Sequence, residues 1–286
     1  MAYGDEIKAE VGRLPITGHG LLMLPQDYRD QMFADLQAAR NGFTGRVHFG
    51  PLPDGGPRVE TALRWFDDFF VKHVKRASFK GTFALHDGPR RLPYPGELLY
   101  QRHAVNSLRA NVVGHVRYVF PEADALHLRP VHDGTGDAHE RMYIGLAFVA
   151  AQQRINSRHG RGQRGYPAAR FDEVTFQSSD SRIAADHAAR VDAELLQLTD
   201  LLLGAMAQAL RFLPTSGKLG RRRLARDVTE QLASYLKHPV YNFDRTRRHF
   251  SVSLYPDERG LMYSPKPPPR TLPTERGRGA QAPLQW

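Results

Sequence analysis

The sequence predicts an α/β protein in which strands and helices alternate along the chain. Two observations predict this class. Short apolar segments with extended character recur along the chain, and between them lie longer segments whose apolar residues recur every three or four positions. A chain of 286 residues can also bury one large core, so we expect one domain over 1–260 and an extended tail over 261–286.

The first half of the chain is expected to open with a strand hairpin and to continue with helices. Pro25 is typical of a helix start and Asn41-Gly42 of a helix end. The expected strands are 2–7, 16–24 and 78–85, and the expected helices are 25–39, 59–74 and 96–116. A brief extended piece at 47–49 and turn-rich loops at 51–57 and 87–95 separate these elements.

The second half repeats the alternation. The expected strands are 126–132, 172–177 and 250–255, and the expected helices are 139–156, 191–212 and 219–236. Arginines alternate with glycines over 157–170, which predicts a mobile basic loop. The Pro/Arg-rich stretch 266–283 buries too little apolar surface to fold alone.

Composition narrows the functional classes. With 40 Lys and Arg against 30 Asp and Glu, the formal charge is +10 and favours an anionic partner such as nucleic acid, although an Arg-rich proteome explains it equally well. No apolar run approaches the roughly 20 residues of a bilayer span, and no secretory signal opens the chain, so we expect a cytoplasmic protein that does not enter the membrane. The absence of cysteine excludes disulfides, thiolate metal sites and cysteine nucleophiles.

Four acidic residues lie where a strand is expected to end or a helix to open: Asp5, Glu6, Asp133 and Asp200. Side chains alternate along a strand, so Asp5 and Glu6 cannot share one inward role. Asp133 precedes Gly134, and an ordinary turn explains this pair as well as a functional carboxylate does.

Asp200 is the most informative of these residues because it interrupts a long apolar helix. Gln197 precedes it by three residues and therefore shares its helical face, while Gly204 follows by four and allows close approach of a neighbouring element. Burying an unpaired carboxylate costs several kcal/mol, so Asp200 requires a metal, a cationic partner or hydrogen bonds. Both a functional role and a structural ion pair meet that requirement.

Other candidate residues carry less information. His48 has apolar neighbours on both sides, which fits a functional histidine and a structural one equally. Gly134 to Gly136 and Gly160 to Gly162 lack the remaining features of a phosphate loop. Ser178, Ser179 and Ser181 follow a strand without the glycines of a nucleophile elbow, so a serine hydrolase is weakly supported.

Taken together, these landmarks resemble the uncharacterised-domain family numbered 3800. They are Tyr3-Gly4-Asp5-Glu6, Arg46-Val47-His48-Phe49, Val131-His132-Asp133 and the helix that carries Gln197, Asp200 and Gly204, and their order also matches over roughly 2–236. The resemblance implies an RNase H-like mixed sheet flanked by helices. Ile7-Lys8 departs from the usual Ser-Gly, and Arg46 stands where the family usually has Glu, so one acidic ligand is missing.

The resemblance implies a metal-dependent nuclease or phosphodiester-processing enzyme. Its metal ligands would be Asp5, Asp133 and Asp200, with Mg²⁺ or Mn²⁺ bound, Glu6 as a substitute ligand, His48 orienting or protonating, and Gln197 in support. Its phosphate contacts would come from Arg158, Arg161, Arg164, Arg221, Arg222 and Arg223. The alternatives are a catalytically inactive nucleic-acid-binding or interaction protein of the same fold, suited to a mobile-element or antiviral system, and an unrelated α/β hydrolase.

Overall fold

The structure is a computed structural model of the 286-residue chain. It describes residues 1–11, 14–50, 52–74, 76–85, 96–120, 122–134, 137–209, 220–227 and 249–255. The expected loop at 87–95, the tail at 266–283 and the end of the expected helix 219–236 lie outside the described residues.

A mixed six-stranded sheet with strand order β7-β5-β1-β2-β3-β8 forms the centre of the molecule. The bounds are β1 Ala2–Val11, β2 Leu14–Met23, β3 Ser78–Leu85, β5 Pro130–Asp133, β7 Thr175–Gln177 and β8 Phe250–Tyr255. The pairs β1–β2 and β2–β3 are antiparallel, and the pairs β1–β5, β5–β7 and β3–β8 are parallel. The expected hairpin and the expected α/β class are therefore confirmed.

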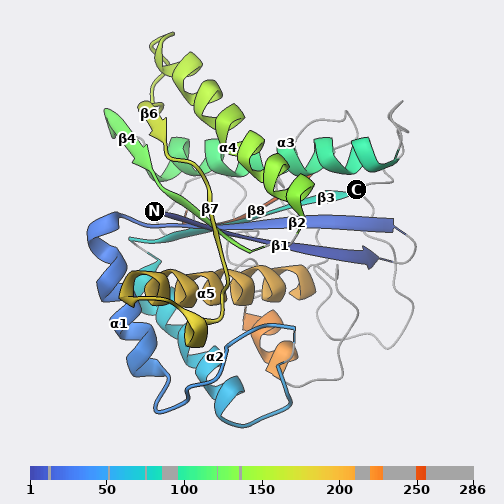
Figure 1. The fold of residues 1–286 in the computed structure, drawn as a ribbon, viewed down its shortest axis with the longest axis vertical. Coiled ribbons are helices and arrows are strands. Elements are labelled where there is room, and N and C mark those ends of the chain that lie inside the picture. The colour runs from blue at the N-terminus through green and yellow to red at the C-terminus, as the bar shows by residue number, and fades with distance from the viewer. Residues whose placement is uncertain are drawn as a thin grey trace, which may run out of the picture.

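Helices cover both faces of this sheet (Figure 1). On one face lie α1, α2 and α5, with bounds Arg29–Ala39, Pro57–Asp68 and His187–Ala209. On the other face lie α3 and α4, with bounds Gly96–Val119 and Ala138–His159. Short helical turns complete the chain: η1 Gln26–Tyr28, η2 Phe69–His73, η3 Ser181–Ile183 and a helical segment at 220–227.

Two hydrophobic cores follow from the alternation of side chains along the strands. Tyr3 of β1 packs into the core with α1, α2 and α5, whereas its neighbour Ala2 packs into the core with α3 and α4. The same division separates Leu22 from Leu21 on β2. One strand thus places successive residues on opposite faces, and this decides which acidic side chains can meet.

The expected strand at 126–132 is wrong as a single element. The chain instead forms β4 Ala125–Leu128 and β5 Pro130–Asp133, which belong to different sheets. Proline has no N–H to donate to a strand ladder, and Pro130 lies at the point where the chain passes from one sheet to the other. β4 pairs with β6, Ala168–Phe171, in a separate two-stranded sheet.

The expected mobile basic loop at 157–170 is also partly wrong. Its first residues belong to the last turn of α4, its last residues form β6, and residues 160–167 between them form two turns with positive φ at Gly162 and Gly165. The brief extended piece at 47–49 pairs with no strand. Among the described residues, none of the helices combines the length and the apolar character needed to cross a bilayer.

Candidate functional site

Asp5, Asp133 and Asp200 come together on the α5 side of the sheet. β1 and β5 run parallel and pair Tyr3 with Val131, and both of these side chains lie in the α5-side core. Asp5 and Asp133 are each two residues further along, so alternation directs them to the same side. Asp200 approaches from α5 and, with Asp133, interacts electrostatically with Asp5.

Asp5 is a buried carboxylate with little compensation from the protein. It is 7% exposed, and within the described residues its carboxylate accepts one hydrogen bond, from the Glu6 N–H at 2.8 Å. Burial, followed by the nearby charges of Asp200 and Asp133, raises the pKa of Asp5 well above its ordinary value. The position therefore favours either a proton or a bound cation.

Two expectations about the first strand are wrong. β1 continues to Val11, so Asp5 and Glu6 lie in the middle of a strand and not at its end. Glu6 shares the face of Ala2 and thus points toward the α3 and α4 side, whereas Asp5 points toward α5. Glu6 is therefore not placed to join Asp5 as a ligand on the α5 side.

Asp200 holds the segment that joins α1 to α2. Its Oδ2 accepts a hydrogen bond from the Phe49 N–H at 2.7 Å and contacts Nδ1 of His48. The Phe49 ring lies where a Cβ on Gly204 would be, with ring atoms only 2.3 Å from that position. The predicted close approach at Gly204 is confirmed, and Asp200 satisfies part of its hydrogen-bonding capacity structurally.

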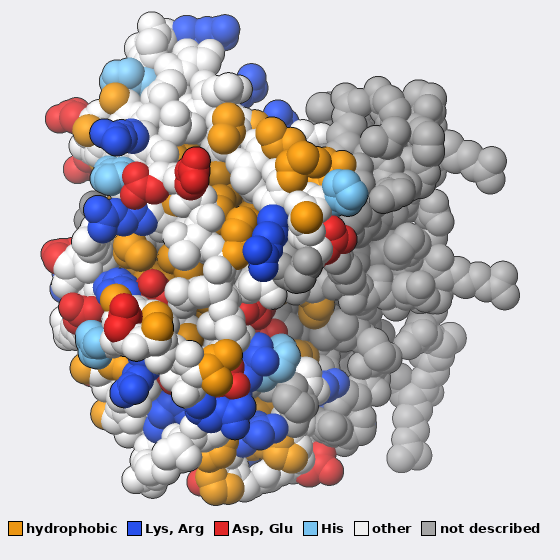
Figure 2. All heavy atoms as spheres, in the orientation of Figure 1, with side chains coloured by type: hydrophobic (Ala, Val, Ile, Leu, Met, Phe, Trp, Pro, Cys, Tyr) orange, Lys and Arg blue, Asp and Glu red, His pale blue; other side chains and the backbone are white. Residues whose placement is uncertain are grey.

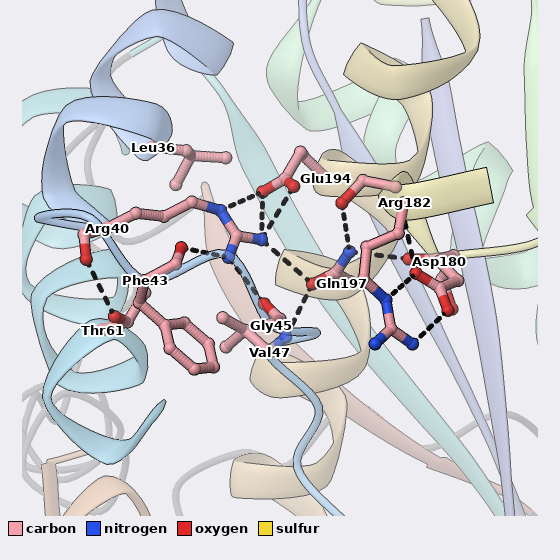
Figure 3. A network of polar contacts seen from close by, with 12 residues as sticks. Leu36, Arg40, Phe43, Gly45, Val47, Thr61, Asp180, Arg182, Glu194 and Gln197 are labelled. Atoms are coloured by element: carbon pink, nitrogen blue, oxygen red, sulfur yellow. Dashed lines mark hydrogen bonds and ion pairs between the residues drawn. The ribbon is translucent and has the colours of Figure 1, made fainter. Parts of the chain in front are cut away.

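A buried network anchors the same segment one turn earlier on α5 (Figure 3). Gln197 Oε1 accepts the Val47 N–H at 2.7 Å, and its Nε2 donates to the Ser179 carbonyl at 2.6 Å. Arg40, 5% exposed, forms a salt bridge of 2.7 Å with Glu194 and donates to the Gly45 carbonyl at 2.7 Å. Gln197 thus supports the backbone of the segment before α2.

Asp133 is held by Ser179 and by Arg46. The Ser179 N–H donates to Asp133 Oδ1 at 2.9 Å and the Ser179 hydroxyl donates to Oδ2 at 3.0 Å. Arg46 Nη2 hydrogen-bonds the same hydroxyl oxygen and lies 3.7 Å from Asp133 Oδ2. Arg46 therefore places a positive charge beside Asp133.

Sequence reasoning missed these partners. Ser179 was considered only as a nucleophile, yet neither it nor Ser178 nor Ser181 bonds a histidine within the described residues. Within the described residues, the hydrolase alternative therefore lacks the Ser-His pair that it requires. Glu194 lies three residues before Gln197 on the buried face of α5, so the spacing that identified Asp200 could also have identified Glu194.

The candidate phosphate-binding arginines separate into two places. Arg221 donates to the Phe49 carbonyl at 3.1 Å, so the segment 220–227 lies beside the acidic group. Arg158 packs on Tyr166 at the end of α4, and the exposed Arg161 and Arg164 follow it on the other side of the sheet (Figure 1). In Figure 2, Lys and Arg side chains gather in the lower region, where Figure 1 shows the segment joining α1 to α2.

The donor atoms suit a hard divalent cation only partly. Within the described residues, one carboxylate oxygen of Asp5 and Oδ1 of Asp200 accept no hydrogen bond, and oxygen is the donor that Mg²⁺ and Mn²⁺ prefer. In the same part of the chain, no three His, Asp or Glu side chains are grouped so that they could hold a metal ion. Because Mg²⁺ usually takes one or two carboxylates plus water and substrate phosphate, the residues fit an open site and not a closed cage.

Comparisons with protein-family models, curated proteins and solved structures found no match for this chain.

Proposed function

We propose that this protein is a metal-dependent phosphodiester-processing enzyme, in the sense of a nuclease, with the RNase H-like fold and family membership that the sequence resemblance implies. The mixed sheet flanked by helices supports that fold. When bound, a divalent cation would supply charge stabilisation and an activated water. Asp5 and Asp200 would hold it, and His48, oriented by Asp200, would exchange a proton with the substrate.

One observation carries this proposal. Asp5 is buried, faces two further carboxylates and has an oxygen without a hydrogen-bond donor in the described part of the chain. Leaving a buried carboxylate uncompensated is costly, so proteins keep such groups where they neutralise a ligand. A cation that is itself shared with a phosphate is the ligand that oxygen donors of this kind recognise.

The basic residues beside this group favour an anionic polymer as substrate. Arg222 and Arg223 follow Arg221 on the segment that contacts Phe49, and both are exposed. They would grip phosphates without reading bases, which matches the net charge of +10. The arginines of 158–164 lie on the other side of the sheet and would serve only a substrate that wraps around the protein.

The test is calorimetry with MnCl₂ and MgCl₂ on the wild-type chain and on Asp200→Asn, together with cleavage of mixed DNA and RNA substrates. We expect Asp200→Asn to weaken ion binding at least about tenfold and to abolish cleavage, since it removes a ligand charge. Asp30→Asn, which changes a carboxylate 76% exposed on α1, is the matched control and should behave as the wild type. Ion binding that Asp200→Asn leaves unchanged would contradict the proposal.

A second function is favoured by a specific contact. Arg46 lies beside Asp133, and Asp200 already accepts bonds from the neighbouring segment, as in a protein that keeps the fold but has lost the chemistry. Such a nucleic-acid-binding protein predicts that Asp133→Asn and Asp200→Asn leave affinity for nucleic acid intact. Absence of any ion binding by the wild type would favour this second function.

A further inference from the structure

Arg46 has a fixed position among the acidic side chains. The residue before it, Gly45, is held through its carbonyl by Arg40 at 2.7 Å, and the residue after it, Val47, is held through its N–H by Gln197 at 2.7 Å. Both anchors belong to the buried network of Figure 3. Hydrogen bonds therefore hold the backbone in place on both sides of Arg46.

The guanidinium of Arg46 is also directed by its own contacts. Nη2 bonds the Ser179 hydroxyl, which in turn donates to Asp133 Oδ2, and the same Nη2 lies 3.7 Å from that oxygen. Ser179 is 1% exposed, so the hydroxyl that joins Arg46 to Asp133 is buried. The side chains of Arg46 and Asp133 are 33% and 27% exposed, so they attract one another more strongly than a fully exposed pair.

The three carboxylates differ in their contacts. Both oxygens of Asp133 accept hydrogen bonds from Ser179, and Arg46 Nη2 lies 3.7 Å from Asp133 Oδ2. Within the described residues, one oxygen of Asp5 and Oδ1 of Asp200 accept no hydrogen bond. A divalent ion at Asp5 and Asp200 would therefore meet oxygens without other partners there, whereas a second ion at Asp133 would lie beside a guanidinium that cannot lose its proton.

We propose that the Arg46 guanidinium takes the place of a cation beside Asp133, so that the site binds one divalent ion through Asp5 and Asp200 while Arg46 neutralises Asp133. This inference rests on the proposed function and specifies its metal stoichiometry. Arg46 is about one-third exposed, so its outer edge also remains open to a phosphate of the substrate.

The experiment counts Mn²⁺ ions by calorimetry and examines their coupling by electron paramagnetic resonance. We expect the wild type to bind one isolated Mn²⁺ and Arg46→Glu, which restores the family's usual acidic residue, to bind a magnetically coupled pair. Arg161→Glu makes the same charge change on the other side of the sheet and should still bind one ion. Thermal unfolding of each variant checks that it is folded.

The outcomes separate this inference from the proposed function. Two Mn²⁺ ions on the wild type, which needs no variant to measure, would overturn the role of Arg46 but leave a metal-dependent enzyme standing. One ion on a folded Arg46→Glu would also overturn it. No Mn²⁺ on either protein would refute the proposed function itself.

Discussion

At the scale of single residues, three carboxylates lie close together and one guanidinium lies beside one of them, Asp133. Asp5 carries most of the cost, since it is the most buried of the three and accepts a single hydrogen bond within the described residues. Asp133 is satisfied by Ser179, whereas the segment before α2 satisfies only one oxygen of Asp200. Asp5 therefore has the fewest stabilising contacts of the three and is the carboxylate best explained by a bound ligand.

The charge of Asp5 should make stability depend on pH. Its pKa is raised above the ordinary value of 3.8, so between these two values the folded state binds more protons than the unfolded state, and stability falls as pH rises through that window. The side chain in Asp5→Asn does not ionise, so the variant avoids this loss of stability. We expect the variant to exceed the wild type in free energy of unfolding at neutral pH by on the order of 1–3 kcal/mol.

Urea unfolding at a series of pH values, with a chelator present, measures this difference. The advantage of Asp5→Asn should shrink as pH falls and disappear below about 4, where the wild-type carboxyl becomes protonated in the unfolded state as well. Added MnCl₂ should stabilise the wild type and leave the variant nearly unchanged. An Asp5→Asn protein that is less stable at neutral pH would show that the carboxylate has a stabilising partner.

At the scale of elements, α5 acts as the support on which the site is assembled. Three positions on one face of this helix hold consecutive residues of the segment before α2: Gln197 holds Val47, Asp200 holds His48 and Phe49, and Gly204 receives the Phe49 ring. The spacing of three and four residues keeps these positions on one side of the helix. The segment thus follows α5 without being a helix or a strand.

Gly204→Ala tests this docking without removing any charge. A methyl group would lie 2.3 Å from the Phe49 ring and 2.7 Å from its Cβ, so the segment itself must move. We expect a loss of about 1–3 kcal/mol in the free energy of unfolding. Gly145→Ala on α4, where nothing lies within 4 Å, is the matched control and should stabilise by about 0.5–1 kcal/mol. Thermal unfolding that ranks the two variants the other way would contradict the proposed packing.

At the scale of the whole molecule, the sheet separates two basic regions. The segment 220–227 lies with the acidic group on the α5 side, and the arginines after α4 lie on the other side (Figure 1). A short nucleic acid held at the acidic group therefore reaches only the first region. The two regions should make unequal contributions to binding.

The salt dependence of nucleic acid affinity measures these contributions. Replacing Arg222 and Arg223 by Ala should weaken binding and reduce the slope of log affinity against log salt by about 2, since each lost phosphate contact reduces it by about 0.9. Replacing the exposed Arg161 and Arg164 by Ala should leave the slope for a short oligonucleotide unchanged. Equal losses from both double variants would mean that the polymer contacts both sides of the sheet.

The local pattern of the chain determined many of its elements. β3 and β8 have the predicted bounds of 78–85 and 250–255, and the close approach at Gly204 follows from the helical spacing of α5. These features could be predicted because apolar periodicity and helix geometry depend on residues only a few positions apart. The same locality explains why Gln197 and Asp200 were identified as neighbours.

Only the tertiary structure decided which of these pieces meet. The length of β1 puts Asp5 in mid-strand, and the pairing of β1 with β5 brings it near Asp133. One expected strand divides before Pro130 into strands of two different sheets, and the docked segment brings Arg46 to Asp133. Each depends on register and packing between residues far apart in sequence. A shift of one residue in β1 would exchange the faces of Asp5 and Glu6, so the composition of the site is a property of the sheet and not of either strand alone.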